Sequence, residues 1–256
     1  MRNPSEKKSI LDFFSFLGLS LYEATHLKGN RHVSLMVLMR QILFTGYEAL
    51  PLISFIALGI GGLVILQGYS LLSTFGQGNL VHMILVTVVI NEMSSLITAL
   101  VVVARSGTAI STELGNMVVH REIDLLRSFG LSPISYLVVS RIYGVMAAML
   151  ILTAYFNIVA VLGGWMFSQL FSNIEFRAFM NGFLLELKLS SIIVNLVKPL
   201  VFGLIIALVS SYEGMSVRQS STEVPQRTIR AVVNSIVLII FSDLVITWLT
   251  WVLAFR

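Results

Sequence analysis

The stretch that decides the fold runs from residue 49 to residue 91 and reads ALPLISFIALGIGGLVILQGYSLLSTFGQGNLVHMILVTVVIN. It contains no Asp, Glu, Lys or Arg, and its charged neighbours are Glu48 and Glu92. A helix that crosses a bilayer needs about 20 mainly apolar residues, so this run is long enough for two spans. The polar, glycine-containing segment at 67–79 divides it. The pattern therefore predicts two membrane-spanning helices joined by a short loop.

The composition of the whole chain agrees with this interpretation. Hydrophobic residues make up 56% of the chain and charged residues only 12%, whereas soluble domains carry about 25% charged residues. The mean hydropathy is +0.89. We expect an all-α integral membrane protein with a single domain over residues 1–256. Residues 1–46 would form a cytoplasmic or interfacial segment, and residues 47–256 the transmembrane core.

Apolar runs of spanning length predict five transmembrane helices, at roughly 49–68, 80–104, 137–167, 190–212 and 231–253. Lys and Arg concentrate in residues 1–46, 105–141 and 218–230, which share one side of the membrane if there are five spans. Because basic loops stay in the cytoplasm, the N-terminus is predicted to be cytoplasmic.

The N-terminal segment has apolar residues at helical spacing between positions 10 and 21, flanked by basic residues. This pattern suits an amphipathic helix that lies in the headgroup region. An ordinary cytoplasmic helix packed on the spans fits it equally well.

Small residues within the spans predict close helix contacts. Ala57, Gly61 and Gly62 lie in the first span, and Gly163 and Gly164 lie in the third. We interpret them as packing positions, within one subunit or across a dimer.

Three ionisable residues fall at membrane depth, where charged side chains are costly and either paired or functional. Glu92 lies in the second span, Lys198 in the fourth and Asp243 in the fifth. An internal ion pair would explain all three. For Glu92 and Lys198, contact with the headgroup of an amphiphile is an equal alternative, whereas for Asp243 an ion pair or a hydrogen-bonded helix contact is favoured over contact with a substrate.

Enzyme and metal signatures are missing from the sequence. There is no GxxxxGK[ST], GxSxG or HExxH pattern, no cysteine, and no shared spacing among the four histidines. We therefore expect no catalytic residue, no metal site and no cofactor in this chain. The basic charge falls beside the spans, so nucleic-acid binding is also not expected.

One dense polar segment, ARSGTAISTELGNMVVHREIDLLRSFGLSP at 104–133, interrupts the apolar sequence. Thr112 is a candidate N-cap of a helix whose apolar stripe would be Val119, Ile123 and Leu126. Pro133 suits the first turn of the next helix. An amphipathic helix between two spans is typical of an element that docks against a partner.

This segment resembles the signature of the MlaE/YrbE permeases, the membrane subunits of ABC-type lipid transporters that work with MCE-domain proteins. The matching positions are Arg105, Gly107, Glu113, Leu114, Gly115, Met117, Asp124, Gly130 and Pro133. Similar stretches at 40–69, 197–214 and 227–247 extend the resemblance over nearly everything after residue 40.

The resemblance implies a non-catalytic permease, a homodimer in the bacterial inner membrane, with ATP bound to a separate ATPase and an MCE protein on the periplasmic face. The residues implied to couple to the ATPase are Glu113, Arg121, Glu122, Asp124 and Arg127. The residues expected to contact lipid are Tyr69, Asn91, Glu92 and Lys198 near the headgroup, with Leu58, Val64 and Leu66 as apolar lining.

The chain departs from the family pattern at two of these places. Arg121 and Glu122 replace a Glu-Gln pair, and Asn91 stands where an arginine is usual. If that arginine holds an anionic headgroup, Lys198 is the expected replacement. Two other functions remain open, an integral membrane enzyme acting on lipids and a scaffold that recruits an ATPase without moving lipid.

Overall fold

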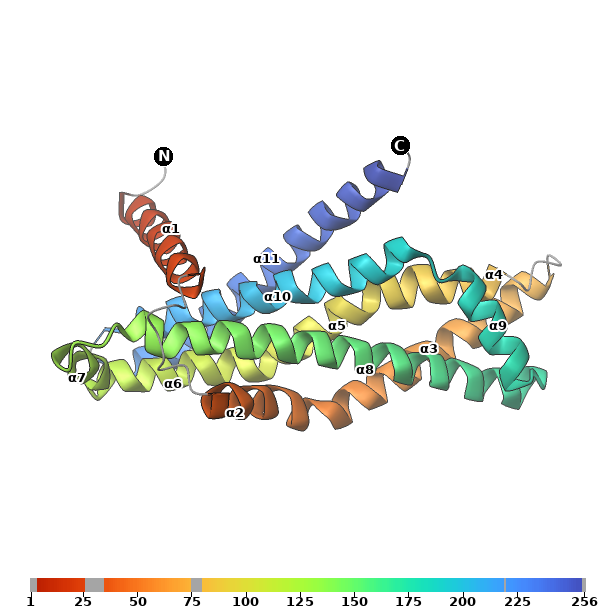
Figure 1. Ribbon diagram of the computed structural model, residues 1–256, viewed down its shortest axis with the longest axis horizontal. Helices are drawn as coiled ribbons and strands as arrows, with labels where there is room; N and C mark the ends of the chain where they lie inside the picture. Colours follow the sequence, from red (N-terminus) through yellow and green to blue (C-terminus); the bar gives the residue numbers. More distant parts are fainter. Residues whose placement is uncertain (1–3, 26–34, 75–79, 219, 255–256) are drawn as a thin grey trace. The chain divides into compact units, whose positions relative to one another are not determined.

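The structure, a computed structural model of the 256-residue chain, describes residues 4–25, 35–74, 80–218 and 220–254 (Figure 1). Regular structure in these ranges is helical, with no β-strand. The α-helices are α1 (Pro4–Thr25), α2 (Leu35–Gly46), α3 (Leu50–Thr74), α4 (Leu80–Ile84), α5 (Ser94–Val102), α6 (Thr108–Val119), α7 (Glu122–Ser128), α8 (Val139–Ser172), α9 (Phe176–Glu186), α10 (Leu189–Met215) and α11 (Glu223–Ala254). A short 3-10 turn, η2 (Tyr47–Ala49), and three π-helical segments, η3 (Leu85–Met93), η4 (Val103–Gly107) and η5 (Ile134–Val138), join some of them.

Five helical stretches of the described chain are long and apolar enough to span a membrane: Gln41–Leu71, Leu80–Val119, Ile134–Phe171, Leu189–Met215 and Glu223–Val252. The prediction of an all-α membrane protein with five spans is confirmed. The second stretch has 40 residues, which is about 60 Å of helix, twice the roughly 30 Å thickness of the hydrocarbon core. The helix therefore continues beyond its apolar residues into the polar segment. There, the mean hydropathy of the sequence does not indicate that the helix continues.

The polar segment differs from its predicted form. Thr112 lies inside α6, and its hydroxyl is 3.1 Å from the Thr228 hydroxyl, so its assignment as an N-cap is wrong. The expected single helix is broken at Arg121, which has a φ of 60° between α6 and α7. Ile123 is buried as predicted. Pro133 immediately precedes η5, at the start of the next helix, also as predicted.

The helix α9 was not predicted, because it lies in the expected loop at 168–189 and is too short to span. Figure 1 shows it between the end of α8 and the start of α10. Phe179 and Phe183, four residues apart on one face, are buried. That spacing is the amphipathic signal that could have identified the helix.

The chain forms two compact units, and α8, α10 and α11 contribute residues to both. Unit 1 consists of Met1–Thr45, Val102–Ala147 and Gly203–Leu238, and unit 2 of Gly46–Val101, Ala148–Phe202 and Ile239–Arg256. Leu114 and Ile206 are buried core residues of unit 1, and Ile65 and Phe156 of unit 2. A single domain over 1–256 stays a prediction.

In unit 1, α1 packs against other helices through its middle and its C-terminal end. The rings of Phe13 and Phe16 lie 5.1 and 5.6 Å from the ring of Tyr212. The Tyr143 hydroxyl donates a hydrogen bond of 2.9 Å to the carbonyl of Ala24. These contacts favour a helix packed on the spans, while its position in a headgroup layer stays a prediction.

In unit 2, small residues let α3 and α8 approach closely, as the sequence predicted. A Cβ added to Gly61 would overlap the carbonyl oxygen of Ala160, and one on Gly163 would lie 2.9 Å from the Cα of Leu58. Neither position tolerates a side chain without a shift of backbone. The small residues therefore serve packing within one subunit.

Candidate functional site

The three ionisable residues predicted at membrane depth meet in unit 2. The Lys198 ammonium lies 2.5 Å from Oε2 of Glu92 and 2.8 Å from Oδ1 of Asp243. It also donates a hydrogen bond of 3.0 Å to the Thr247 hydroxyl, which in turn donates to Glu92 Oε2 at 3.1 Å. We call these four residues the lysine cluster. It ties η3, α10 and α11 together.

Exposure differs sharply within the lysine cluster. The side chain of Lys198 has 0% exposure, that of Asp243 15% and that of Glu92 39%. A buried ammonium is costly unless it is paired and hydrogen-bonded, and both carboxyl groups satisfy this need. The internal ion pair considered for these residues is therefore present. Glu92, rather than Lys198, is the member open to a ligand in this conformation.

The π-helical segment η3 carries two neighbouring polar side chains, Asn91 and Glu92, that both reach α10. Its wider turn is closed by the backbone N–H of Ser94, which bonds to the carbonyl of Val89 five residues earlier. Glu92 forms an ion pair with Lys198, and the Asn91 amide donates a hydrogen bond of 3.1 Å to the hydroxyl of Ser191. Such π turns inside α-helices often occur at functional sites.

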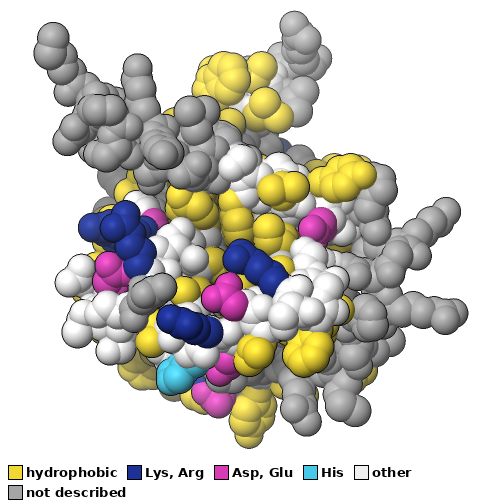
Figure 2. All heavy atoms as spheres, turned by 90° about the vertical axis from the view of Figure 1, so that its left-hand side faces the viewer, with side chains coloured by type: hydrophobic (Ala, Val, Ile, Leu, Met, Phe, Trp, Pro, Cys, Tyr) yellow, Lys and Arg dark blue, Asp and Glu magenta, His cyan; other side chains and the backbone are white. Residues whose placement is uncertain are grey.

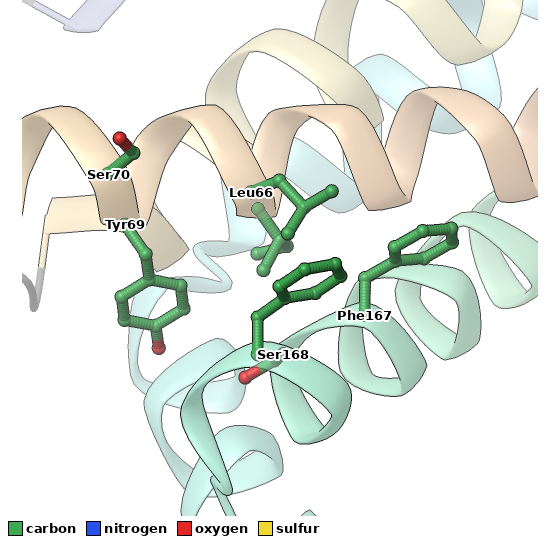
Figure 3. A pocket seen from close by; sticks show the side chains of 7 residues that line it. Leu66, Tyr69, Ser70, Phe167 and Ser168 are labelled. Carbon is green, nitrogen blue, oxygen red and sulfur yellow. The ribbon is translucent and has the colours of Figure 1, made fainter.

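Tyr69 lies in a second place, a cavity of approximately 340 Å³ between α3 and α8 (Figure 3). Leu66 lines the same cavity, and Phe167 and Ser168 face it from α8. The Tyr69 ring stands edge-on to the ring of His82, with centroids 6.4 Å apart. Among the described residues that line this cavity, neither Glu92 nor Lys198 occurs. The predicted headgroup residues are thus divided between two places.

The remaining two residues proposed as apolar lining lie elsewhere on α3. Leu58 is partly exposed, and its backbone is the surface against which Gly163 packs. Val64 is half-buried. Neither lines the cavity of Tyr69.

In unit 1, the residues predicted to couple to an ATPase have two different surroundings. Glu113 of α6 forms an ion pair of 2.8 Å with the almost buried Arg141 of α8. Asp124 and Arg127 of α7 lie 3.5 Å apart and are mostly exposed, and Arg121 is exposed beside them. Glu113 therefore joins two helices, whereas the other residues are available at the surface.

Helix α7 also carries apolar side chains that the sequence analysis did not single out. Leu125 is 57% exposed and Phe129, the residue after α7, is 76% exposed. Figure 2 shows this face, where Lys or Arg, Asp or Glu and hydrophobic side chains lie next to one another. Glu122 is exposed on the same helix. A mixed apolar and charged surface of this kind is typical of a protein-binding site.

The described residues of the two units offer no evident metal site. Within the residues that the structure describes, no three His, Cys, Asp or Glu side chains gather as ligands of one ion. In the lysine cluster, an ammonium already occupies the position between the two carboxyl groups.

Comparison with known proteins bears on this arrangement. A family model described as Permease MlaE matches residues 38–249, which include the lysine cluster and α7. The chain belongs to the MlaE permease family. A probable ABC transporter permease of Rickettsia typhi is 31% identical over 95% of this chain and 92% of its own length. The intermembrane phospholipid transport system permease MlaE of Haemophilus influenzae is 23% identical over 94% of both chains.

A plant protein is also similar to this permease. The chloroplastic protein trigalactosyldiacylglycerol 1 of Arabidopsis thaliana is 32% identical over 61% of this chain and 45% of its own length.

The sequence held signals for cluster residues that were not singled out as ligand contacts. Asp243 and Thr247 are four residues apart on α11, and both reach Lys198. Residues with this spacing lie on one face of a helix. A search for polar pairs at this spacing inside apolar helices would have found this side of the site.

Proposed function

We propose that this MlaE-family permease is the membrane subunit of an ABC-type transporter that moves a phospholipid or similar amphiphile. The lipid would pass between the bacterial inner membrane and a periplasmic MCE protein. A separate ATPase would bind ATP and drive the cycle, so this chain itself would need no cofactor and perform no catalysis. The names of the Rickettsia and Haemophilus relatives, an ABC transporter permease and a phospholipid transport permease, support this assignment.

The observation that carries the proposal is the surface of α7. It presents Leu125 and the adjoining Phe129 together with exposed charges. The ion pair of the exposed Glu113 with the almost buried Arg141 joins α6 to α8, the helices before and after α7. A partner that moves α7 would therefore act on two spans at once. This is the arrangement that an external ATPase needs.

The lysine cluster supports the handling of an amphiphile. Glu92 is paired with Lys198 but keeps 39% of its side chain exposed at the predicted membrane depth, where a polar ligand would stabilise the exposed part. In the proposed homodimer, the lipid cavity lies between two copies and is lined by spans one and two with help from span four. Tyr69 and Asn91 complete its polar side, with Lys198 buried behind Glu92, and Leu58, Val64 and Leu66 form its apolar side.

The proposed topology places the N-terminus and α7 in the cytoplasm and the MCE protein on the periplasmic face of the inner membrane. The distribution of Lys and Arg among the loops supports this orientation.

Co-purification from the native membrane tests the assembly. Glu122→Lys with Asp124→Lys should abolish association with the ATPase, because both exposed side chains reverse their charge. The matched control makes the same charge change at the two ends of α9, in Glu175→Lys with Glu186→Lys. This variant should retain the ATPase. Intact association and lipid-dependent ATP hydrolysis in the first variant would contradict the docking role.

Lipid bound to the purified complex tests the headgroup assignment. Mass spectrometry should detect phospholipid in the natural complex and less of it in Glu92→Ala with Lys198→Ala. Unchanged lipid retention in that variant would remove these residues from the site. Lipid turnover by the purified chain without nucleotide would instead indicate an enzyme, and ATPase binding without any lipid a scaffold.

A further inference from the structure

The charges of the lysine cluster do not balance. The Lys198 ammonium lies 2.5 Å from Oε2 of Glu92 and 2.8 Å from Oδ1 of Asp243. One positive and two negative side chains leave one negative charge in excess when all three are ionised. A charge at membrane depth is costly unless it is paired, so this excess calls for a further cation.

The other cations in the described part of unit 2 do not supply it. Arg177 belongs to α9, Lys188 lies just before α10, and both are outside the spans. Lys188 precedes Lys198 by ten residues, which is about 15 Å along a helix. Neither forms an ion pair with Glu92 or Asp243 in the described structure, where Lys198 is their shared partner.

The charge that the cluster offers to a ligand is negative. The side chain of Lys198 has 0% exposure, so the ammonium is out of reach of a phosphate group. The side chain of Glu92 has 39% exposure. An anionic group that approaches the cluster therefore meets a carboxylate first and is repelled, whereas a cationic group meets an opposite charge.

Hydrogen bonding leaves Glu92 able to accept from a ligand. Its Oε2 accepts from Lys198 at 2.5 Å and from the Thr247 hydroxyl at 3.1 Å. The same hydroxyl lies 3.3 Å from Oε1, but a hydroxyl has one hydrogen and cannot serve both oxygens fully. Oε1 of Glu92 thus keeps acceptor capacity on a partly exposed side chain.

The polar side chain next to Glu92 is directed to other partners. The amide nitrogen of Asn91 donates to the Ser191 hydroxyl at 3.1 Å, and its oxygen accepts from the amide of Asn195 at 3.5 Å. Both ends of this carboxamide are engaged by α10. The described side chains that bind Glu92 are therefore Lys198 and Thr247.

The chemistry of the ligand follows from these two needs, a positive charge and a hydrogen-bond donor. A water molecule or a headgroup hydroxyl donates but brings no charge. A quaternary ammonium brings charge but has no N–H to donate. A primary ammonium supplies both, because it is a cation with three N–H donors.

We propose that Glu92 binds the primary ammonium of a zwitterionic phospholipid, of the phosphatidylethanolamine class, and that the lysine cluster selects this class over anionic phospholipids. The ammonium donates to Oε1 of Glu92 and balances the excess charge, while Lys198 holds the carboxylate in place from behind. This inference rests on the proposed function, since it names the headgroup that the transporter accepts.

Competition between lipids tests the selection. The purified full-length chain in mixed micelles receives equal amounts of phosphatidylethanolamine and phosphatidylglycerol with the same acyl chains, and mass spectrometry measures the lipid it retains. Phosphatidylethanolamine should exceed phosphatidylglycerol on the order of tenfold, as for one hydrogen bond to a charged group. Phosphatidylethanolamine with an acetylated amine, which has lost the positive charge, should be retained only as well as phosphatidylglycerol.

The outcomes separate this inference from the transport function. Equal retention of the two lipids, as expected if a proton on Glu92 balances the cluster, would overturn the selection and leave lipid transport standing. A preference for phosphatidylglycerol would do the same. Retention of neither lipid would count against the proposed function itself, and the selection would fall with it.

One substitution assigns the preference to its residue. Glu92→Gln keeps the shape of the side chain and removes its charge, so the tenfold preference should fall to about equal retention. Glu175→Gln makes the same chemical change at an exposed position beside α9 and should keep the preference. A folded Glu92→Gln protein that still prefers phosphatidylethanolamine would refute the assignment. If that variant fails to fold, the comparison of free and acetylated amine on the natural protein still decides whether the ammonium is recognised.

Discussion

Replacing Lys198 with Met removes the only cation of the lysine cluster while keeping a long unbranched side chain. The variant loses contacts of 2.5 Å to Glu92, 2.8 Å to Asp243 and 3.0 Å to Thr247. Removing one partner of a buried ion pair costs about 3–5 kcal/mol. Because the Glu92 side chain is 39% exposed and can regain water, we expect the lower end, about 3 kcal/mol.

The free energy of unfolding in mixed detergent micelles, followed by circular dichroism, measures this loss. Lys188→Met is the matched control, since it removes an exposed lysine just before α10 and should change stability by less than about 0.5 kcal/mol. Adding Asp243→Asn to Lys198→Met should recover part of the loss, because one fewer carboxyl group is left without a cation. The reasoning is refuted if Lys198→Met is as stable as Lys188→Met, or if the added substitution only lowers stability further.

The same unfolding assay tests three other features. Gly61→Ala should destabilise by about 1–3 kcal/mol, because its Cβ would lie 2.8 Å from the carbonyl carbon of Ala160. Gly59→Ala, with no described atom within 4 Å of the new Cβ, should be neutral or stabilising by up to about 1 kcal/mol. Equal losses of stability in Gly59→Ala and Gly61→Ala would contradict the packing of α3 on α8. Arg121→Gly should raise the free energy of unfolding by up to about 1 kcal/mol, because glycine adopts the φ of 60° without strain. A lower stability would show that contacts of the arginine side chain outweigh this relief of backbone strain. Glu113→Gln should cost about 1–3 kcal/mol by leaving a guanidinium with 7% exposure without its carboxylate, and an unchanged stability would mean that this ion pair contributes nothing.

The five spans could be predicted because their boundaries depend on local composition. The charge-free run between Glu48 and Glu92 is long enough for two spans, and its polar centre divides it. Burial in lipid places nearly the same demand on every residue of a span, so a sum over a window suffices. The close approach at Gly61 and Gly163 could also be predicted, because small residues within a span usually mark a contact between helices.

The helix ends could not be predicted in this way. The second spanning helix continues through the polar segment to Val119 and stops where Arg121 adopts a left-handed conformation. Nothing in the side chain of arginine requires that conformation, and Thr112 was as good an N-cap by its residue type as many real ones. Contacts such as that between Glu113 and Arg141 join residues far apart in the sequence, so a local sequence pattern does not show them.

The lysine cluster shows the same division between local and distant information. Sequence reasoning identified Glu92, Lys198 and Asp243 individually, because each is an ionisable residue in an apolar run. It could not choose between an internal pair and a ligand contact, since that choice depends on which helices are neighbours. For Asp243 it favoured an ion pair or a hydrogen-bonded helix contact, and that residue does share the lysine with Glu92.

The structure also gives a physical account of Asn91, which stands where relatives are expected to carry an arginine. Lys198 is not a spare cation that replaces that arginine, because Glu92 and Asp243 already engage it. Asn91 instead donates a hydrogen bond of 3.1 Å to the hydroxyl of Ser191 and accepts one of 3.5 Å from the side-chain amide of Asn195. An arginine at this position would bring a second cation beside a cluster that formally has one positive and two negative groups. With asparagine, charge in η3 is confined to Glu92, and the side chain before it is held to Ser191 by an uncharged hydrogen bond.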